Sequence, residues 1–156
     1  MRAVVQRVER AQVWVDREQV GAIGRGLLVY LGVGPHDDEE VARHLAGRLA
    51  GLRIFADEAG KMNRSALEVG AGILLVSQFT LFADLQHGHR PSFLGAGPPD
   101  LGRRLCGEVA RALSDIGVNP VAQGRFGAHM TVDSSNDGPV TIVASAGEPP
   151  WAADCR

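Results

Sequence analysis

Cysteine is scarce in this chain of 156 residues, which contains only Cys106 and Cys155. Cys106 falls within a helical pattern and Cys155 lies one residue from the C-terminus. Two cysteines so placed form neither a disulfide framework nor a metal cluster. We therefore expect both to be reduced thiols.

Long hydrophobic runs are also missing. No apolar run approaches the roughly 20 residues that a transmembrane helix needs. The first 15 residues alternate between apolar and polar side chains and carry charge, which is unlike a signal peptide. These absences predict a soluble, cytoplasmic protein with no membrane partner.

The chain has no large excess of either sign of charge, and aromatic residues are few. The formal net charge is −2, the pI is about 6.2, and Lys and Arg are scattered along the chain. This argues against a long nucleic-acid groove, which would neutralise many phosphates, so any RNA contact should be short and local. With 5% aromatic residues and a single tyrosine, the chain has little for a stacking platform.

The apolar content of 45% is enough for one globular domain. Alternation of apolar and polar residues predicts a strand over 2–15, with one slip that suggests a bulge. Further strands are expected after it, making an N-terminal β meander. The most strand-like segment, 73–82, is apolar on both faces and should be central. The other expected strands cover 27–33, a hairpin within 52–63, 120–126, 129–136 and 139–145.

Two helices are expected. The first follows Pro35, has the acids 37–40 in its first turn, where they complement the helix dipole, and ends near Gly51. The second follows Pro98-Pro99 with Asp100 as N-cap and ends at Gly117. Strands, then helices, then strands predict an α+β domain over residues 1–146. Residues 147–156 have no periodicity and are expected to form a flexible tail.

Several motifs do not indicate a site. The glycines of "GAIGRG" and "GVGPHDDEE" have the wrong spacing for a nucleotide-binding loop and are better explained as turns. "HGHR" places His87 and His89 two residues apart, but a third ligand at a suitable spacing is missing. We therefore expect no metal and no cofactor. Ser77 lacks the glycine-flanked turn that exposes a hydrolase nucleophile, so conventional covalent hydrolysis is not expected.

Two segments remain unexplained by packing alone. "SQFT", 77–80, puts three polar side chains in an otherwise apolar strand, where they either join strands by hydrogen bonds or line a cavity. Gly138-Pro139 lies at the start of a strand-like segment, where it forms either a hairpin turn or a functional bend.

Taken together, "VSQFTL" (76–81) and "NDGPVT" (136–141) resemble the two signature motifs of the D-aminoacyl-tRNA deacylase family, of the D-tyrosyl-tRNA deacylase type. The similarity covers residues 1 to about 146, and further landmarks occur in family order. These are "QRV" (6–8), "GLLVYLGV" (26–33), "RIFAD" (53–57), "GKMN" (60–63), "RPSF" (90–93) and "RFGAHM" (125–130).

The resemblance implies a homodimer of three-layer β/β/α subunits with mainly antiparallel, barrel-like sheets and two principal helices. It implies hydrolysis of the ester that joins a D-amino acid, or glycine, to the 3′-terminal adenosine of tRNA, with rejection of L-aminoacyl-tRNA. The backbone amides of Phe79 and Thr80 would stabilise the oxyanion. Ser77 and Gln78 would shape the pocket around the sugar and adenine.

Chiral selection is implied to come from the partner subunit. In the family, the Gly138-Pro139 bond is cis and enters the partner's active site, where its two carbonyls accept from the substrate ammonium. The same backbone excludes an L side chain by steric clash, whereas glycine has none to exclude. Arg7 would hold this bend inward, and Met130 would lie beside the pocket.

Alternatives remain open at this point. A relative that deacylates a misacylated L-aminoacyl-tRNA carries a trans Gly-Pro bond, and a non-catalytic nucleic-acid-binding module could use the same scaffold. For the reaction itself, Thr80 is a candidate nucleophile, but no general base stands beside it in the sequence. We favour attack by water assisted by the ribose 2′-hydroxyl.

Overall fold

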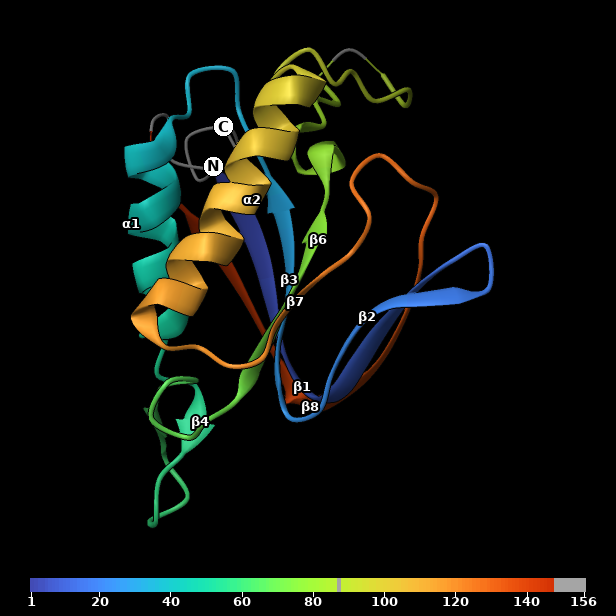
Figure 1. Ribbon diagram of the computed structural model, residues 1–156. Coiled ribbons are helices and arrows are strands. Elements are labelled where there is room, and N and C mark those ends of the chain that lie inside the picture. The colour runs from blue at the N-terminus through green and yellow to red at the C-terminus, as the bar shows by residue number, and fades with distance from the viewer. Residues whose placement is uncertain (87, 148–156) are drawn as a thin grey trace.

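A computed structural model describes residues 1–86 and 88–147 (Figure 1). Expectations for His87 and for residues 148–156, including Cys155 and most of the tail, lie outside the described residues. The elements are β1 (Arg2–Val15), β2 (Glu18–Ile23), β3 (Gly26–Gly32), α1 (Glu39–Ala50), β4 (Phe55–Ala56), β5 (Met62–Arg64), β6 (Gly72–Ser77), the 3-10 turn η1 (Phe79–Phe82), α2 (Pro99–Ile116), β7 (Val121–Gln123) and β8 (Thr131–Ser145). The α+β prediction is confirmed.

The main sheet is organised around β1. The strand order is β2-β1-β3-β6-β7, and β8 pairs with β1 along its other edge. β1 is antiparallel to β2, β3 and β8, whereas β3, β6 and β7 are mutually parallel neighbours. The predicted meander is wrong, because β1 is long enough for β3 to pair with its first half and β2 with its second.

The two ends of the sheet approach each other. A Cβ on Gly21 of β2 would lie only 2.6 Å from the carbonyl oxygen of Gln123 in β7, so glycine is required for this close approach. The strands therefore nearly close into a barrel.

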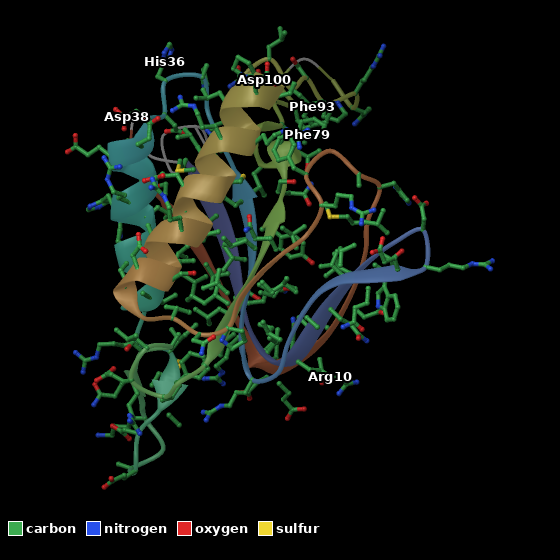
Figure 2. All side chains as sticks on the ribbon, in the orientation of Figure 1. Arg10, His36, Asp38, Phe79, Phe93 and Asp100 are labelled. Carbon is green, nitrogen blue, oxygen red and sulfur yellow. The ribbon has the colours of Figure 1, made fainter. Side chains whose placement is uncertain are left out.

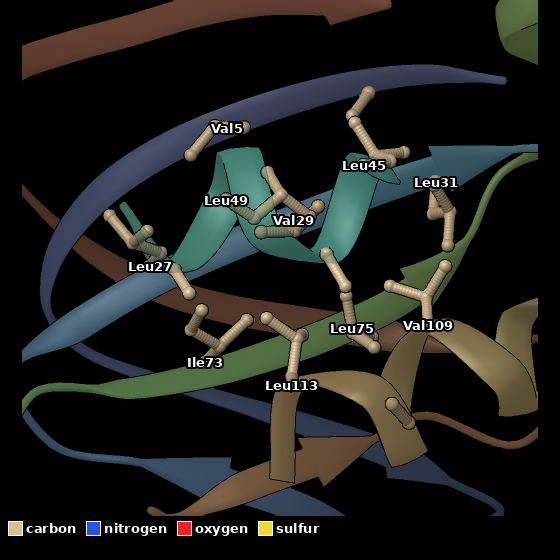
Figure 3. Packing of buried hydrophobic residues seen from close by; sticks show 14 of the residues in the cluster. Val5, Leu27, Val29, Leu31, Leu45, Leu49, Ile73, Leu75, Val109 and Leu113 are labelled. Atoms are coloured by element: carbon tan, nitrogen blue, oxygen red, sulfur yellow. The ribbon is translucent and has the colours of Figure 1, made fainter. Parts of the chain in front are cut away.

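Apolar residues on alternate faces of the strands form two separate cores. One lies inside the barrel and consists of Val8, Ala11, Val13, Ile23, Leu28, Leu74 and Val76. The other lies between the sheet and the two helices, which cover one side of it (Figures 1 and 3). There, Leu27, Val29 and Leu31 of β3 and Ile73 and Leu75 of β6 pack with Leu45 and Leu49 of α1 and Val109 and Leu113 of α2. The result is the β/β/α layering that was expected.

The helices begin and end for local reasons. Asp38 caps α1 by accepting a 2.9 Å hydrogen bond from the Val41 amide, and Gly51 ends the helix as predicted. The expectation that Asp100 caps α2 is wrong, because the helix already starts at Pro99, whose ring suits a first helical position that needs no amide donor. Gly117 ends α2 in the left-handed conformation, with φ of 109°.

Asp37 has a different role from the acids that follow it. Its side chain is buried and accepts from the amino terminus of Met1 at 2.6 Å and from the Gly34 amide at 2.6 Å. The same ammonium donates to the carbonyl of Ala146. The prediction that all four acids 37–40 lie in the first helical turn is therefore correct only for Glu39 and Glu40. Asp38 is the N-cap, and Asp37 holds the amino terminus that also binds Ala146.

Two strand predictions need correction. Segment 73–82 is not one strand, because β6 ends at Ser77 and the chain turns into η1. Segments 129–136 and 139–145 are one long strand, β8, so the hairpin-turn interpretation of Gly138-Pro139 is wrong. Both halves of β8 pair with β1, and the register shifts at the motif. The Gly138-Pro139 peptide bond is cis, as the resemblance implied.

In the part of the chain that the structure describes, no helix is long and apolar enough to span a membrane.

Candidate active site

A cavity of about 750 Å³ opens at the C-terminal ends of the parallel strands β3 and β6. Its walls come from these strand ends, from η1, from the loop 93–99 that leads into α2, and from the loop 126–130 between β7 and β8. The carboxyl ends of parallel strands are a usual place for ligand sites, because the chain leaves the sheet there in diverging loops. The volume suits a small-molecule ligand.

The segment 77–80 forms one wall. The Gln78 amide donates to the carbonyl of Leu31 at 2.8 Å, and this is the last hydrogen bond to β3 before the chain turns into η1. Ser77, Gln78 and Phe79 line the cavity, and the side-chain amide of Gln78 donates to Oγ1 of Thr80. Of the two interpretations of "SQFT", lining a cavity describes the first three residues, and the fourth is bonded to the second.

Two backbone amides at this turn are free. Within the described residues, the hydrogen bonds of η1 begin with the Leu81 amide, which donates to Gln78 at 3.3 Å, and the amides of Phe79 and Thr80 have no acceptor. The first amides of any helical turn lack partners within the turn. Here they stand beside the cavity and can donate to an external oxygen.

Aromatic residues form the mouth of the cavity. The rings of Phe79 and Phe93 meet edge to face, with centroids 5.2 Å apart, close to the start of α2 (Figure 2). Phe79 is 58% exposed, which leaves much of its ring available for contact. Phe126 also lines the cavity, and the guanidinium of Arg103 lies 4.9 Å from the centroid of its ring.

Close backbone contact holds the third wall. The Gly97 amide donates to the carbonyl of Val33 at 2.8 Å, and a Cβ on Gly97 would lie 2.7 Å from the carbonyl oxygen of Gly34. Only glycine permits this approach. The loop 93–99 is thereby attached to the end of β3.

Most of the groups that line the cavity are apolar. Among the described residues that line it there is no carboxylate, lysine or arginine, and the polar side chains are those of Tyr30, Ser77, Gln78 and His129. Burial raises the pKa of the Tyr30 hydroxyl, and it raises the pKa of the Cys106 thiol to about 11, so both are protonated at neutral pH. No cluster of three or more metal-ligating side chains occurs among residues 1–86 and 88–147. The described part of the site therefore offers hydrogen bonds and apolar surface, with no carboxylate, lysine or arginine.

The structure places only some of the remaining predicted residues at this cavity. Met130 lines it together with Ser77, Gln78 and Phe79. Gly138 and Pro139 do not, and both are exposed on β8. Arg7 accompanies them, because its Nε lies 2.9 Å from Oδ2 of Asp137.

Sequence reasoning gave no role to several residues of the cavity, namely Tyr30, Phe93, Phe126 and His129. Phe93, Phe126 and His129 were within noted motifs, "RPSF" and "RFGAHM". Aromatic residues in glycine- and proline-containing loops of a chain with few aromatics were the signal that could have identified them.

The family model for D-Tyr-tRNA(Tyr) deacylase matches residues 4–145. The chain belongs to this family. The family's curated relatives include a D-aminoacyl-tRNA deacylase of Deinococcus radiodurans, 57% identical over 143 residues that cover 92% of this chain and 98% of the relative. A D-aminoacyl-tRNA deacylase of Thermomicrobium roseum is 53% identical over 148 residues, 95% of this chain and 96% of the relative.

A solved structure of the c-Myc DNA Unwinding Element Binding Protein superimposes with a TM-score of 0.88 and 39% identity. The match covers 94% of this chain and 99% of that one. The family resemblance found in the sequence is therefore confirmed by the family model and by the curated relatives.

Proposed function

We propose that this protein hydrolyses the ester bond of D-aminoacyl-tRNA, and of glycyl-tRNA, and releases the free amino acid and tRNA. It acts in the cytoplasm as a quality control of translation and needs no cofactor. The observation that carries the proposal is the pair of free amides at Phe79 and Thr80 beside a neutral cavity, in a chain that belongs to this deacylase family.

Ester hydrolysis requires stabilisation of the oxyanion that forms when the carbonyl is attacked. Each preorganised amide donor contributes about 2.7–4 kcal/mol to this step. Water forms the new bond to the carbonyl carbon, the bond to the ribose 3′-oxygen breaks, and the proton from water passes to that oxygen with help from the 2′-hydroxyl. The described residues that line the cavity include no carboxylate that could act as a base, which favours assistance by the substrate.

Thr80 has a contact that argues against a nucleophilic role. Its Oγ1 accepts a hydrogen bond from Gln78, and among the described residues it has no hydrogen bond to a basic side chain that would activate it. Thr80→Ala should therefore retain substantial activity. Near-complete loss of activity with preserved folding would favour the covalent route instead.

The terminal adenosine fits the cavity by chemistry. A neutral, mostly apolar cavity with hydroxyl and amide groups suits a base and sugar, and the exposed ring of Phe79 offers an aromatic surface. Ser77 and Gln78 contact the sugar and adenine, and Met130 packs beside them.

Chiral selection requires a second subunit. Gly138 and Pro139 are exposed and lie outside their own chain's cavity, so a twofold dimer that places this motif over the partner's cavity accounts for both facts. Their carbonyls accept from the substrate ammonium, and their bulk excludes an L side chain. Arg7 holds the motif in place through its ion pair with Asp137, the residue directly before Gly138.

The decisive assay incubates the purified protein with D-tyrosyl-, L-tyrosyl- and glycyl-tRNA and follows the release of each amino acid. Loss of the D and glycyl esters alone is expected. Preferential release of an L-amino acid would identify the L-specific relative. Tight binding of uncharged RNA or DNA without deacylation would favour a nucleic-acid-binding module. DNA binding is what the name of the c-Myc DNA Unwinding Element Binding Protein describes.

Intersubunit complementation tests the contribution of the partner. Phe79→Ala keeps the backbone amide but removes the aromatic ring that contacts the substrate in the cavity, and Pro139→Ala alters the motif, so each variant alone should be impaired. A mixed dimer of the two has one site with both parts intact. After an equal mixture is unfolded and refolded together, about a quarter of the parent activity should return, because half of the dimers are mixed and each has one complete site. No recovery would exclude supply from the partner.

A further inference from the structure

The Gly-Pro motif lies in a wide bulge of β8. Gln6 pairs with Thr141 and Val8 pairs with Asn136, so four residues of β8, 137–140, face the single residue Arg7 of β1. Residues in a bulge lose the regular ladder of backbone hydrogen bonds. The direction in which the backbone carbonyls of Gly138 and Pro139 point must therefore depend on other contacts.

Arg7 occupies the space under this bulge. Its Nη1 donates to the carbonyl of Ile54, and a Cβ on Gly138 would lie 3.4 Å from Nη2. Its side chain is 12% exposed, so most of the guanidinium is removed from water. A largely buried cation requires a charged or polar partner.

Asp137 supplies that partner from within the bulge. Its Oδ2 lies 2.9 Å from Nε of Arg7, and in the described part of the chain Nε has no hydrogen-bond acceptor, so the contact is ionic. The side chain of Asp137 is 38% exposed, and the residue directly precedes Gly138. The ion pair thus joins the bulge to a side chain that is itself attached to the segment before β4.

We propose that Asp137 is a positioning residue that sets the direction of Gly138-Pro139 through Arg7, and so contributes to the discrimination between D- and L-aminoacyl-tRNA. The proposal rests on the proposed function. Without the carboxylate, the remaining partner of the Arg7 side chain among the described residues is the carbonyl of Ile54, and the bulge can move away from the ammonium and the blocked side-chain position. A less precisely held barrier admits an L substrate more readily than it slows a D substrate, so selectivity falls more than rate.

The test compares Asp137→Asn, Asp137→Glu and Asp133→Asn. Asp133 is a matched control, because it is an exposed acid on the same strand with no ion pair among the described residues. Single-turnover rates on D-tyrosyl- and L-tyrosyl-tRNA give the D-to-L ratio for each variant. Because the pair is partly exposed, Asp137→Asn should lower this ratio by about two- to fivefold. Asp137→Glu should restore most of it, and Asp133→Asn should match the parent.

An unchanged ratio in Asp137→Asn would overturn the proposal, as would an equal loss in Asp137→Glu, since the charge would then be irrelevant. Arg7→Gln provides a second test. If Asp137 acts through Arg7, adding Asp137→Asn to Arg7→Gln should change the ratio no further. Additive effects would show that Asp137 acts independently of Arg7.

Amide hydrogen exchange of segment 136–141 separates this proposal from the proposed function. Exchange should be faster in Asp137→Asn than in Asp133→Asn, even if the parent released no amino acid. Unchanged exchange would refute the positioning role whatever the activity. A parent without deacylation but with the expected exchange would refute only the function.

Discussion

Asp37 offers a test of how the start of the chain is held in the fold. Its carboxylate is 6% exposed and lies 2.6 Å from the amino terminus of Met1, which is fully buried. Replacing Asp37 by Asn keeps the size of the side chain and an oxygen for the Gly34 amide, but it removes the negative charge. The buried ammonium is then left with the carbonyl of Ala146 as its remaining acceptor among the described residues.

The expected cost is large because one charge loses its counter-ion in a dry environment. Removing one partner of a buried pair typically costs about 3–5 kcal/mol, a large part of the roughly 5–15 kcal/mol that stabilises a domain. Asp38→Asn is the matched control, one residue further along. Asp38 is exposed and caps α1, and asparagine caps a helix about as well, so the control should lose less than about 0.5 kcal/mol.

Urea unfolding followed by circular dichroism measures both variants, with any purification tag placed at the C-terminus so that the ammonium is undisturbed. With a slope of about 2 kcal/mol/M, Asp37→Asn should move the midpoint down by roughly 2 M. Equal midpoints for the two variants would refute the assignment of the charge pair. A large loss in Asp38→Asn would show that the cap, rather than the ammonium, dominates this corner.

Three further predictions concern single side chains. Because burial raises the pKa of Cys106 to about 11, the native thiol should resist iodoacetamide at pH 8 and react after unfolding, as peptide mass spectrometry would show; rapid native alkylation would contradict this. The hydrogen bonds from Arg111 and Arg43 lower the pKa of Glu108, so the ionised carboxylate stabilises the folded state at neutral pH and this contribution is lost as pH falls. Glu108→Gln should therefore lower Tm at pH 7 but not near pH 3. Phe93→Ala removes the ring contact to Phe79, worth about 0.5–1.5 kcal/mol, and should raise KM two- to tenfold with little change in kcat; the opposite split would place Phe93 in the chemical step.

Local features of this protein could be predicted from the sequence because their causes are local. The end of α1 at Gly51 and the end of α2 at Gly117 follow from short-range capping. The hairpin of β4 and β5 follows from its turn residues. The apolar run that becomes β6 is buried on both faces because it has no polar face to expose.

The site was predictable only in part. Ser77, Gln78, Phe79 and Met130 were expected at one pocket and do line one cavity. Thr80 lies beside it through its bond to Gln78. The expectation came from the order of motifs along the chain, since no spacing rule connects segment 77–80 to a methionine 50 residues later.

The amino-acid sequence by itself determined the α+β class, both helices and the family. Tertiary structure decided which strands pair, where β6 stops and how Asp37 reaches Met1. It also decided that Gly138-Pro139 lies in a bulge within one strand and is not a turn between two strands. The difference is physical: propensities and caps act over a few residues, whereas strand pairing and cavity walls depend on contacts between segments that are distant in the chain. The acceptor that ends β6, the carbonyl of Leu31, is 47 residues away from the amide it binds, and only folding brings the two together.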